Sequence, residues 1–124
     1  MAVQDYKELK VWQKSVDLAI KLYEIVKDLP SDERYAISDQ MRRAVVSIAS
    51  NIAEGQQRYN SKEFKHFLKI SLGSLAELET QLIICQKTNM IDDLTIENML
   101  KECNVVTKMI FALMKSLPTN KKHK

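Results

Sequence analysis

The sequence predicts an all-α protein in which four antiparallel helices form an up-down-up-down bundle, and three observations support this prediction. The chain has 124 residues, which is enough for one domain with a buried core. It contains only two glycines and two prolines, the residues that break helix interiors. Its hydrophobic content of 45% argues against disorder, and its apolar residues recur at helical spacing in four segments.

The first helix is expected at residues 9–29 and carries two apolar stripes. The first stripe consists of Leu9, Trp12, Val16, Ala19, Tyr23 and Val26, and the second of Val11, Leu18, Leu22, Ile25 and Leu29. Both have the spacing of a helical face, and Pro30 ends the helix. Two stripes are more than one bundle core needs. We therefore expect the second stripe to lie against another copy of the chain.

The second helix is expected at residues 33–58, with Ser31 as a candidate N-cap. Its core stripe is Ile37, Met41, Ala44 or Val45, Ile48 and Ile52. Its opposite edge is polar and small, and consists of Gln40, Arg43, Ser47, Ser50, Asn51 and Glu54.

The third helix is expected at residues 62–88 and the fourth at residues 93–117. Ser61 is a candidate N-cap, Asn89 can end the third helix, and Asp92 or Asp93 starts the fourth. The core stripes are Phe64, Phe67, Leu68, Leu72, Leu75, Leu78, Leu82 and Cys85, and then Leu94, Met99 or Leu100, Cys103, Val106, Ile110, Leu113 and Leu117. Short connections make neighbouring helices antiparallel. The bundle would occupy residues 1–118 and be followed by a basic, flexible tail at 119–124.

The net charge of +3 lies in that tail, where Lys121, Lys122 and Lys124 have no acidic neighbour. Residues 1–117 contain equal numbers of basic and acidic residues. The overall charge is therefore weak support for a nucleic-acid partner.

Nothing in the sequence has the spacing of a catalytic site. Cys85 and Cys103 occupy apolar helical positions without a metal-binding motif, as expected for buried thiols in a reducing cytoplasm. The two glycines do not form a phosphate-binding loop, and no signal peptide or membrane-spanning run is seen. We expect a cytoplasmic protein without enzymatic activity or a cofactor.

A metal-carrying or enzymatic bundle is the alternative, because Glu63 and His66 have the Glu-x-x-His spacing of di-iron bundles. Such a site needs two of these pairs and two further carboxylates facing inward, and the other histidine, His123, is in the tail. Phe64 and Phe67 are also expected on the inward face of this helix, which would turn Glu63 and His66 outward.

A basic stripe crosses from the second helix into the third, although a solvated face is the simpler interpretation. The candidate nucleic-acid-binding residues are Arg42, Arg43, Arg58, Lys62, Lys65, Lys69, Lys121 and Lys122, and His66 lies among them. Tyr59 supplies the one nearby ring for stacking, so base-specific recognition is not indicated.

Small polar residues predict a hydrogen-bonded layer between the second and third helices. Its expected members are Ser47, Asn51, Glu54, Ser71, Ser74 and Glu77. Small side chains permit close approach, and paired polar groups fix the helix register. The alternative is a ligand or partner groove. In it, Arg42 and Arg43 would pair with Glu54 or Glu77, or face a phosphate.

Several runs resemble a known family. They are Leu9-Lys10-Val11-Trp12-Gln13, Gln40-Met41-Arg42-Arg43-Ala44, Ser50-Asn51-Ile52-Ala53-Glu54-Gly55, Ser71, Gly73-Ser74 and Glu77-Leu78-Glu79. From about residue 6 to residue 117, the sequence resembles the bacterial four-helix-bundle family named for the 23S rRNA intervening-sequence protein, which is sometimes labelled ribosomal-protein-like.

The resemblance implies a bundle that assembles into a ring, typically a homopentamer. It also implies similarity to the accessory variability protein of diversity-generating retroelements, a basic pentamer that binds a reverse transcriptase and nucleic acid. That family has no defined catalytic residues to carry over. We therefore expect a non-enzymatic, homo-oligomeric scaffold or accessory protein. Its partners would be RNA, DNA or a reverse transcriptase-like protein, and a purely structural protein-interaction module is the alternative.

Overall fold

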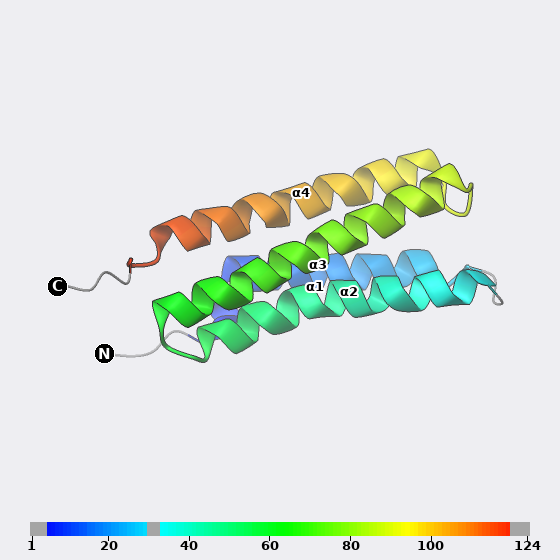
Figure 1. Cartoon of the computed structure of the whole chain (residues 1–124). Helices are drawn as coiled ribbons and strands as arrows, with labels where there is room; N and C mark the ends of the chain where they lie inside the picture. The colour runs from blue at the N-terminus through cyan, green and yellow to red at the C-terminus, as the bar shows by residue number, and fades with distance from the viewer. Residues whose placement is uncertain (1–4, 30–32, 120–124) are drawn as a thin grey trace.

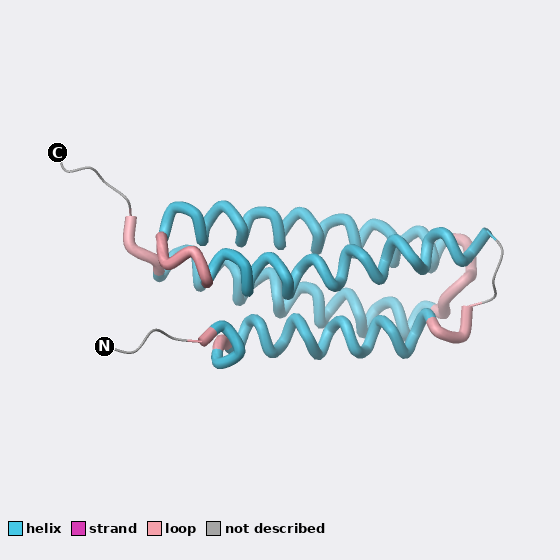
Figure 2. Tube along the Cα trace, turned by 90° about the horizontal axis from the view of Figure 1, so that it is seen from below, coloured by secondary structure: helices cyan, strands magenta, loops and turns pink. Residues whose placement is uncertain are grey.

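The computed structural model describes residues 5–29 and 33–119, and its regular elements there are all helical. A short 3-10 turn at Tyr6–Glu8 precedes the four helices of the bundle. These are α1 (Lys10–Val26), α2 (Glu33–Gln56), α3 (Ser61–Lys87) and α4 (Asp93–Ser116). Successive helices run in opposite directions and lie alongside one another over most of their length (Figures 1 and 2). The predicted fold class is therefore confirmed.

The helices form a closed ring of neighbours. Helix α1 packs against α2 and α4, and α3 packs against the same two helices from the opposite side. This is the arrangement expected when short loops join consecutive antiparallel helices. The start of α3 and the end of α4 consequently lie at the same end of the molecule (Figure 1).

The helix ends follow from local hydrogen bonds. Asn60, rather than the predicted Ser61, caps α3, because its side chain accepts a hydrogen bond from the Glu63 backbone N–H at 3.0 Å. Asp92 caps α4 by accepting hydrogen bonds from the backbone N–H and the hydroxyl of Thr95. Asn89 has a left-handed φ of 62°, as expected for the residue that turns the chain after α3. The predicted cap at Ser31 lies outside the described residues.

Helix α1 ends at Val26, three residues before the expected boundary at Leu29. The residue before a proline is disfavoured in the α region, and Leu29 precedes Pro30. The helix therefore gives way to a turn in which the Leu29 N–H donates to the Val26 carbonyl.

The core of the bundle contains Val11, Leu18 and Leu22 of the second α1 stripe but, from the first stripe, only Val26 is buried, so the prediction about which stripe remains outside was wrong. The buried residues of α1 are Val11, Ser15, Leu18, Leu22 and Val26. Three members of the first stripe, Trp12, Val16 and Ala19, are half-buried, and Tyr23 is exposed. The first stripe is therefore the one that remains largely outside the core, and it lies on the side of α1 that faces α2.

The core stripe of α4 also differs from the prediction at its start. Leu94 is 67% exposed, whereas Ile96 is completely buried. The buried positions continue through Met99 and Cys103 at spacings of three and four. Leu94 is two positions before Ile96, so it points to the opposite side of the helix.

A close approach of α2 and α3 is built around Gly55. A Cβ atom at this position would lie 2.6 Å from the Cβ of Phe67 and 2.9 Å from Cδ1 of Phe64. The missing side chain therefore lets the two phenylalanines of α3 pack directly on the backbone of α2. None of the helices in the described part is both long and apolar enough to cross a membrane.

Candidate functional site

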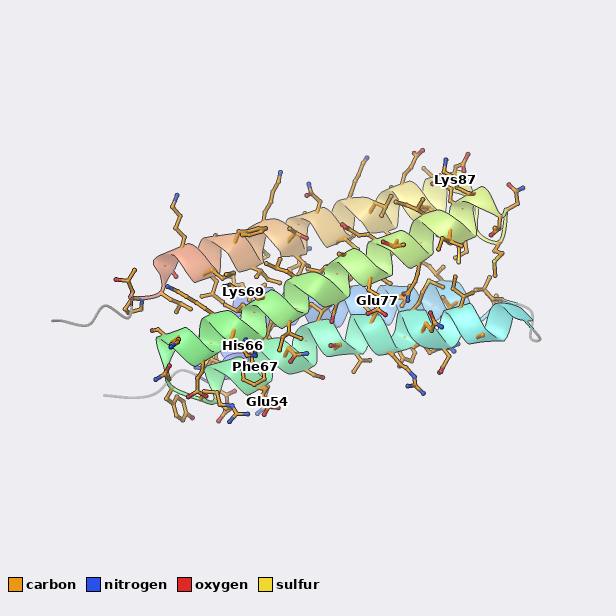
Figure 3. The ribbon with its side chains drawn as sticks, in the orientation of Figure 1. Glu54, His66, Phe67, Lys69, Glu77 and Lys87 are labelled. Atoms are coloured by element: carbon orange, nitrogen blue, oxygen red, sulfur yellow. The ribbon has the colours of Figure 1, made fainter. Side chains whose placement is uncertain are left out.

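The lysines of the predicted basic stripe lie at the start of α3. Lys62 and Lys69 are exposed, and Lys65 is half-buried. Figure 3 shows Lys69 and His66 near this end of the helix, with Glu77 and Lys87 progressively farther along it. None of the three stripe lysines has a carboxylate within ion-pair distance in the described part of the chain. Their charges are therefore available to an external anion.

Arg58 belongs to the same end of the molecule, but its charge already has a partner. Its Nη2 lies 2.8 Å from Oε2 of Glu54, one turn earlier on α2. Its guanidinium also lies over the ring of Phe67, 5.0 Å from the centroid. Arg58 is therefore held by neighbouring side chains, unlike the three lysines.

Arg42 and Arg43 do not join this stripe. Arg43 pairs with Asp39 at 3.2 Å, and Arg42 lies over the Tyr23 ring at 5.6 Å from its centroid. Fifteen residues separate Arg43 from Arg58, which is roughly 22 Å along a helix. The candidate nucleic-acid residues are therefore two separate groups, and Lys121 and Lys122 lie outside the described residues.

The small polar residues between α2 and α3 make a connected set of hydrogen bonds. The Ser74 hydroxyl donates to the Ser47 hydroxyl at 2.9 Å, and the Asn51 amide donates to Ser47 as well. The buried Ser71 hydroxyl donates to the Ile48 carbonyl at 2.9 Å. These bonds tie α2 to α3 where the helices approach closely.

The two carboxylates expected in this layer are outside it. Glu54 is exposed and pairs with Arg58, and Glu77 is exposed on α3. The alternative in which Arg42 or Arg43 pairs with these glutamates is wrong, because both arginines have the other neighbours described above. The serines and the asparagine that remain in the layer are neutral, and their hydrogen bonds join α2 to α3.

An apolar groove of about 580 Å³ runs between α1 and α2 on the outside of the bundle. Its lining residues are Tyr6, Trp12, Val16, Ala19, Ile20, Tyr23, Glu24, Val46, Ala49, Ser50 and Ala53. Ile20 is 58% exposed and Val46 is 44% exposed. The α1 wall is the spare stripe, whereas the sequence reasoning missed the α2 wall. In the sequence, this wall appears only as Val46 and small alanines on a largely polar edge of the helix, a pattern that indicates an apolar surface weakly.

The Glu-x-x-His pair does not face the bundle interior. Glu63 and His66 are both exposed, and the His66 ring contacts Phe67 edge-on at 5.6 Å. Within the described residues, no three His, Cys, Asp or Glu side chains are grouped so that they could hold a metal ion.

The two thiols are buried in the core. Burial raises the pKa of Cys103 to about 12, with the nearby Glu79 and Glu102 contributing in the same direction. Burial also raises the pKa of Cys85. Because the thiolate is the nucleophilic form, neither sulfur is placed for covalent catalysis.

A second group of cations was missed altogether by the sequence reasoning. Lys101, Lys108 and Lys115 are exposed on α4, and Phe111 between them is 55% exposed. Their signal was present as a seven-residue spacing of lysines in a segment that has no acid after Glu102.

Comparisons with known proteins give two findings. The model of a family described as the 23S rRNA-intervening sequence protein matches residues 7–112. A crystal structure from Bacteroides thetaiotaomicron, of a protein of unknown function from the S23 ribosomal protein family, is similar with a TM-score of 0.79. It shares 25% sequence identity, and the alignment covers 86% of this chain and 96% of that chain. No curated protein matches.

Proposed function

This chain belongs to the 23S rRNA-intervening sequence protein family, and from that premise we propose that it is a non-enzymatic, homo-oligomeric scaffold in the cytoplasm. The scaffold would bind nucleic acid or a nucleic-acid-processing protein. A ring of five copies is the assembly that the family resemblance favours.

The apolar groove between α1 and α2 is the observation that carries the proposal. It has half-buried Trp12 and Val16 on one wall and exposed Val46 on the other, with Ile20 at 58% exposure on its rim. Contiguous apolar surface of this kind is unfavourable in water and is typical of a protein interface. A second copy of the chain would cover it, so the bundle would be a subunit of a larger particle.

Light scattering coupled to size exclusion tests the self-association. We expect the wild-type protein at micromolar concentration to have a mass that is a multiple of 14.3 kDa. The variant Ile20→Glu should shift the mass toward the single chain, because it places a charge in the groove. Leu94→Glu is the matched control, since Leu94 is also exposed but lies outside the groove. A wild-type protein of 14.3 kDa at all these concentrations would contradict the proposal.

Nucleic-acid binding is the second part of the proposal. Lys62, Lys65 and Lys69 carry no ion pair in the described part of the chain, whereas Arg43 and Arg58 do. The family description contains 23S rRNA, and the similar structure belongs to a ribosomal protein family. Lysines on a near-neutral body would give weak, sequence-independent binding to phosphates that falls as the salt concentration rises.

The test is fluorescence anisotropy of labelled RNA over a range of salt concentrations. Wild-type affinity should fall linearly on a logarithmic salt scale. Replacing Lys62, Lys65 and Lys69 together by glutamine should lower both the affinity and this slope. Binding that does not change between low and moderate salt would rule out the electrostatic account.

A purely structural role with a protein partner predicts a different result, namely an oligomer that binds no RNA at low salt and co-purifies with a defined protein. The metal-carrying alternative has less support, because Glu63 and His66 are both exposed. Elemental analysis of the purified protein would show a stoichiometric metal only if that alternative is correct.

A further inference from the structure

We propose that the outer face of α4, together with the start of α3, is a binding surface for single-stranded RNA, with lysines on the phosphates and Phe111 stacked on a base. This inference rests on the nucleic-acid-binding part of the proposed function and names the ligand class and the site. We refer to the α4 part of this surface as the α4 face, and define it by Lys101, Lys108, Phe111 and Lys115.

The lysines of the α4 face form one row. Lys101, Lys108 and Lys115 are seven residues apart, which brings successive side chains to nearly the same side of a helix. Each interval is about 10.5 Å along the axis, so the row extends roughly 21 Å. Figure 3 shows nitrogen-tipped side chains projecting from α4 away from the other helices.

In the described part of the chain, no carboxylate lies within ion-pair distance of these three lysines, and Glu97, one turn before Lys101, is exposed. The six ion pairs found there all lie on other faces of the bundle. Glu102, the last acidic residue of the sequence, turns toward α1 and lies 3.1 Å from Lys21 and 3.6 Å from Lys14. Its pKa is lowered chiefly by its hydrogen bond with Lys21, as expected for a carboxylate engaged elsewhere.

The start of α3 extends the same positive surface. Helices α3 and α4 pack together in opposite directions, so Lys62, Lys65 and Lys69 lie at the end of the molecule that also holds the last turns of α4 (Figure 1). The stretches 61–76 and 103–119 together contain five lysines and a single acidic residue, Glu63. A nearly neutral protein thus concentrates its unpaired cations here, which creates a local positive potential.

Phe111 gives this surface its preference for unpaired bases. It lies three residues after Lys108 and four before Lys115, so its ring is on the same side of the helix between the two charges. More than half of the side chain is exposed. Aromatic rings flanked by cations are the usual platform for single-stranded nucleic acid, because each unpaired base offers a face for stacking. A duplex hides those faces.

A second ring lies at the same end of the bundle. Tyr59, in the turn between α2 and α3, is 64% exposed and has a φ of 54°. A left-handed conformation is uncommon for a bulky residue, and the ring of Tyr59 lies outside the packed core. Tyr59 can stack on a further base where the strand leaves the α4 face.

Anisotropy titrations of labelled oligouridine test this inference, with an RNA duplex and oligothymidine as comparison ligands. The double variant Lys108→Gln, Lys115→Gln should lower the salt slope for oligouridine by about 1.4, since each single-strand phosphate contact contributes roughly 0.7. Phe111→Leu keeps an apolar side chain but removes the ring. It should weaken single-strand binding by about fivefold or more and leave duplex binding unchanged.

The charge control is the double variant Lys10→Gln, Lys87→Gln, which removes two exposed lysines from elsewhere on the surface. Wild-type binding that is lost with this control as much as with the α4 variants would overturn the site. Wild-type binding that persists in the α4 variants but disappears with the α3 triple variant would overturn it while leaving the proposed function standing. Absence of any wild-type RNA binding at low salt would instead contradict the proposed function.

Oligothymidine distinguishes RNA from DNA. We expect oligouridine to bind more tightly than oligothymidine, and equal or tighter binding of oligothymidine would overturn the assignment to RNA. Light scattering of Phe111→Leu completes the test, because a loss of oligomer mass would place this ring in a subunit interface and overturn its role in stacking.

Discussion

At the scale of single residues, the glycine of α2 and the glycine of α3 have very different surroundings. Gly55 lies against Phe64 and Phe67, whereas a Cβ atom at Gly73 would meet nothing within 4 Å. The Cβ of Phe67 is fixed to the α3 backbone, so a side chain at Gly55 can be accommodated only if the two helices move apart. Gly73 is a helical glycine in open space, for which the packing within the chain gives no reason.

We expect Gly55→Ala to destabilise the fold by about 1–3 kcal/mol through overpacking, despite the better helix propensity of alanine. The matched variant Gly73→Ala should stabilise it by up to about 1 kcal/mol. Urea unfolding followed by circular dichroism measures both free energies. An equal or higher midpoint for Gly55→Ala would show that α2 and α3 are not as close as described.

The buried thiol of Cys103 makes a pH-dependent prediction. Its native pKa of about 12 lies above the ordinary value of 9.0, so the neutral thiol is favoured in the folded state. This contribution to stability is present below pH 9 and is lost as the pH rises from 9 toward 12. At pH 8, the native protein should react very slowly with an aromatic disulfide reagent, and the urea-unfolded protein rapidly. Rapid reaction of both thiols in the native protein would contradict their burial.

At the scale of helices, the sequence predicted the number, order and approximate bounds of the elements because periodicity and capping are local properties. It could not decide which stripe of α1 faces the core. Both stripes have helical spacing, and the choice depends on where α2 and α4 lie around α1. The same limit explains Leu94, whose position two residues before Ile96 places it outside once the packing of α4 is set.

The candidate site was predicted less well than the fold. Arg42 and Arg43 are candidates from the sequence because they lie beside the polar layer and could face a phosphate, but their distance along the helix separates them from Arg58. The spacing of the α4 lysines is visible in the sequence, but the sequence does not show that Glu102 pairs with two lysines of α1, a contact between helices far apart in the sequence. Counting charges along the sequence does not reveal which lysines a carboxylate pairs with.

The N-terminal cap of α4 makes a prediction at this scale. Hydrogen bonds from Thr95, first from its backbone and then from its side chain, lower the pKa of Asp92 below the ordinary value of 3.8. The ionised cap therefore stabilises the fold above that pH, and the contribution disappears as the pH falls through the lower native pKa. Asp92→Ala should lower the melting temperature at neutral pH.

The matched variant Asp92→Asn separates the cap from its charge, because asparagine can cap a helix without titrating. Its melting temperature should depend less on pH than that of the wild type between pH 5 and pH 2, an interval of about three units around the ordinary pKa. Identical pH profiles for the two proteins would show that Asp92 does not contribute as a charged cap.

At the scale of the whole molecule, the bundle has two kinds of surface with different requirements. The groove between α1 and α2 is apolar and is the proposed subunit contact, whereas the α4 face carries lysines without ion pairs and an exposed ring. They lie on different sides of the ring of helices, so both can be used at once. An oligomer whose subunits associate through the groove would display one α4 face on each subunit. Such repetition increases the affinity for a long strand without any new contact.

Sedimentation velocity with fluorescently labelled RNA can decide whether this protein is an assembled, non-catalytic scaffold that binds RNA. At low salt and micromolar protein, we predict that the labelled RNA moves with a particle containing several 14.3 kDa chains. Raising the salt should release the RNA while the protein particle stays intact, because apolar contacts hold the subunits and charges hold the RNA. Protein that sediments as a single chain, or RNA that sediments alone at low salt, would contradict the claim.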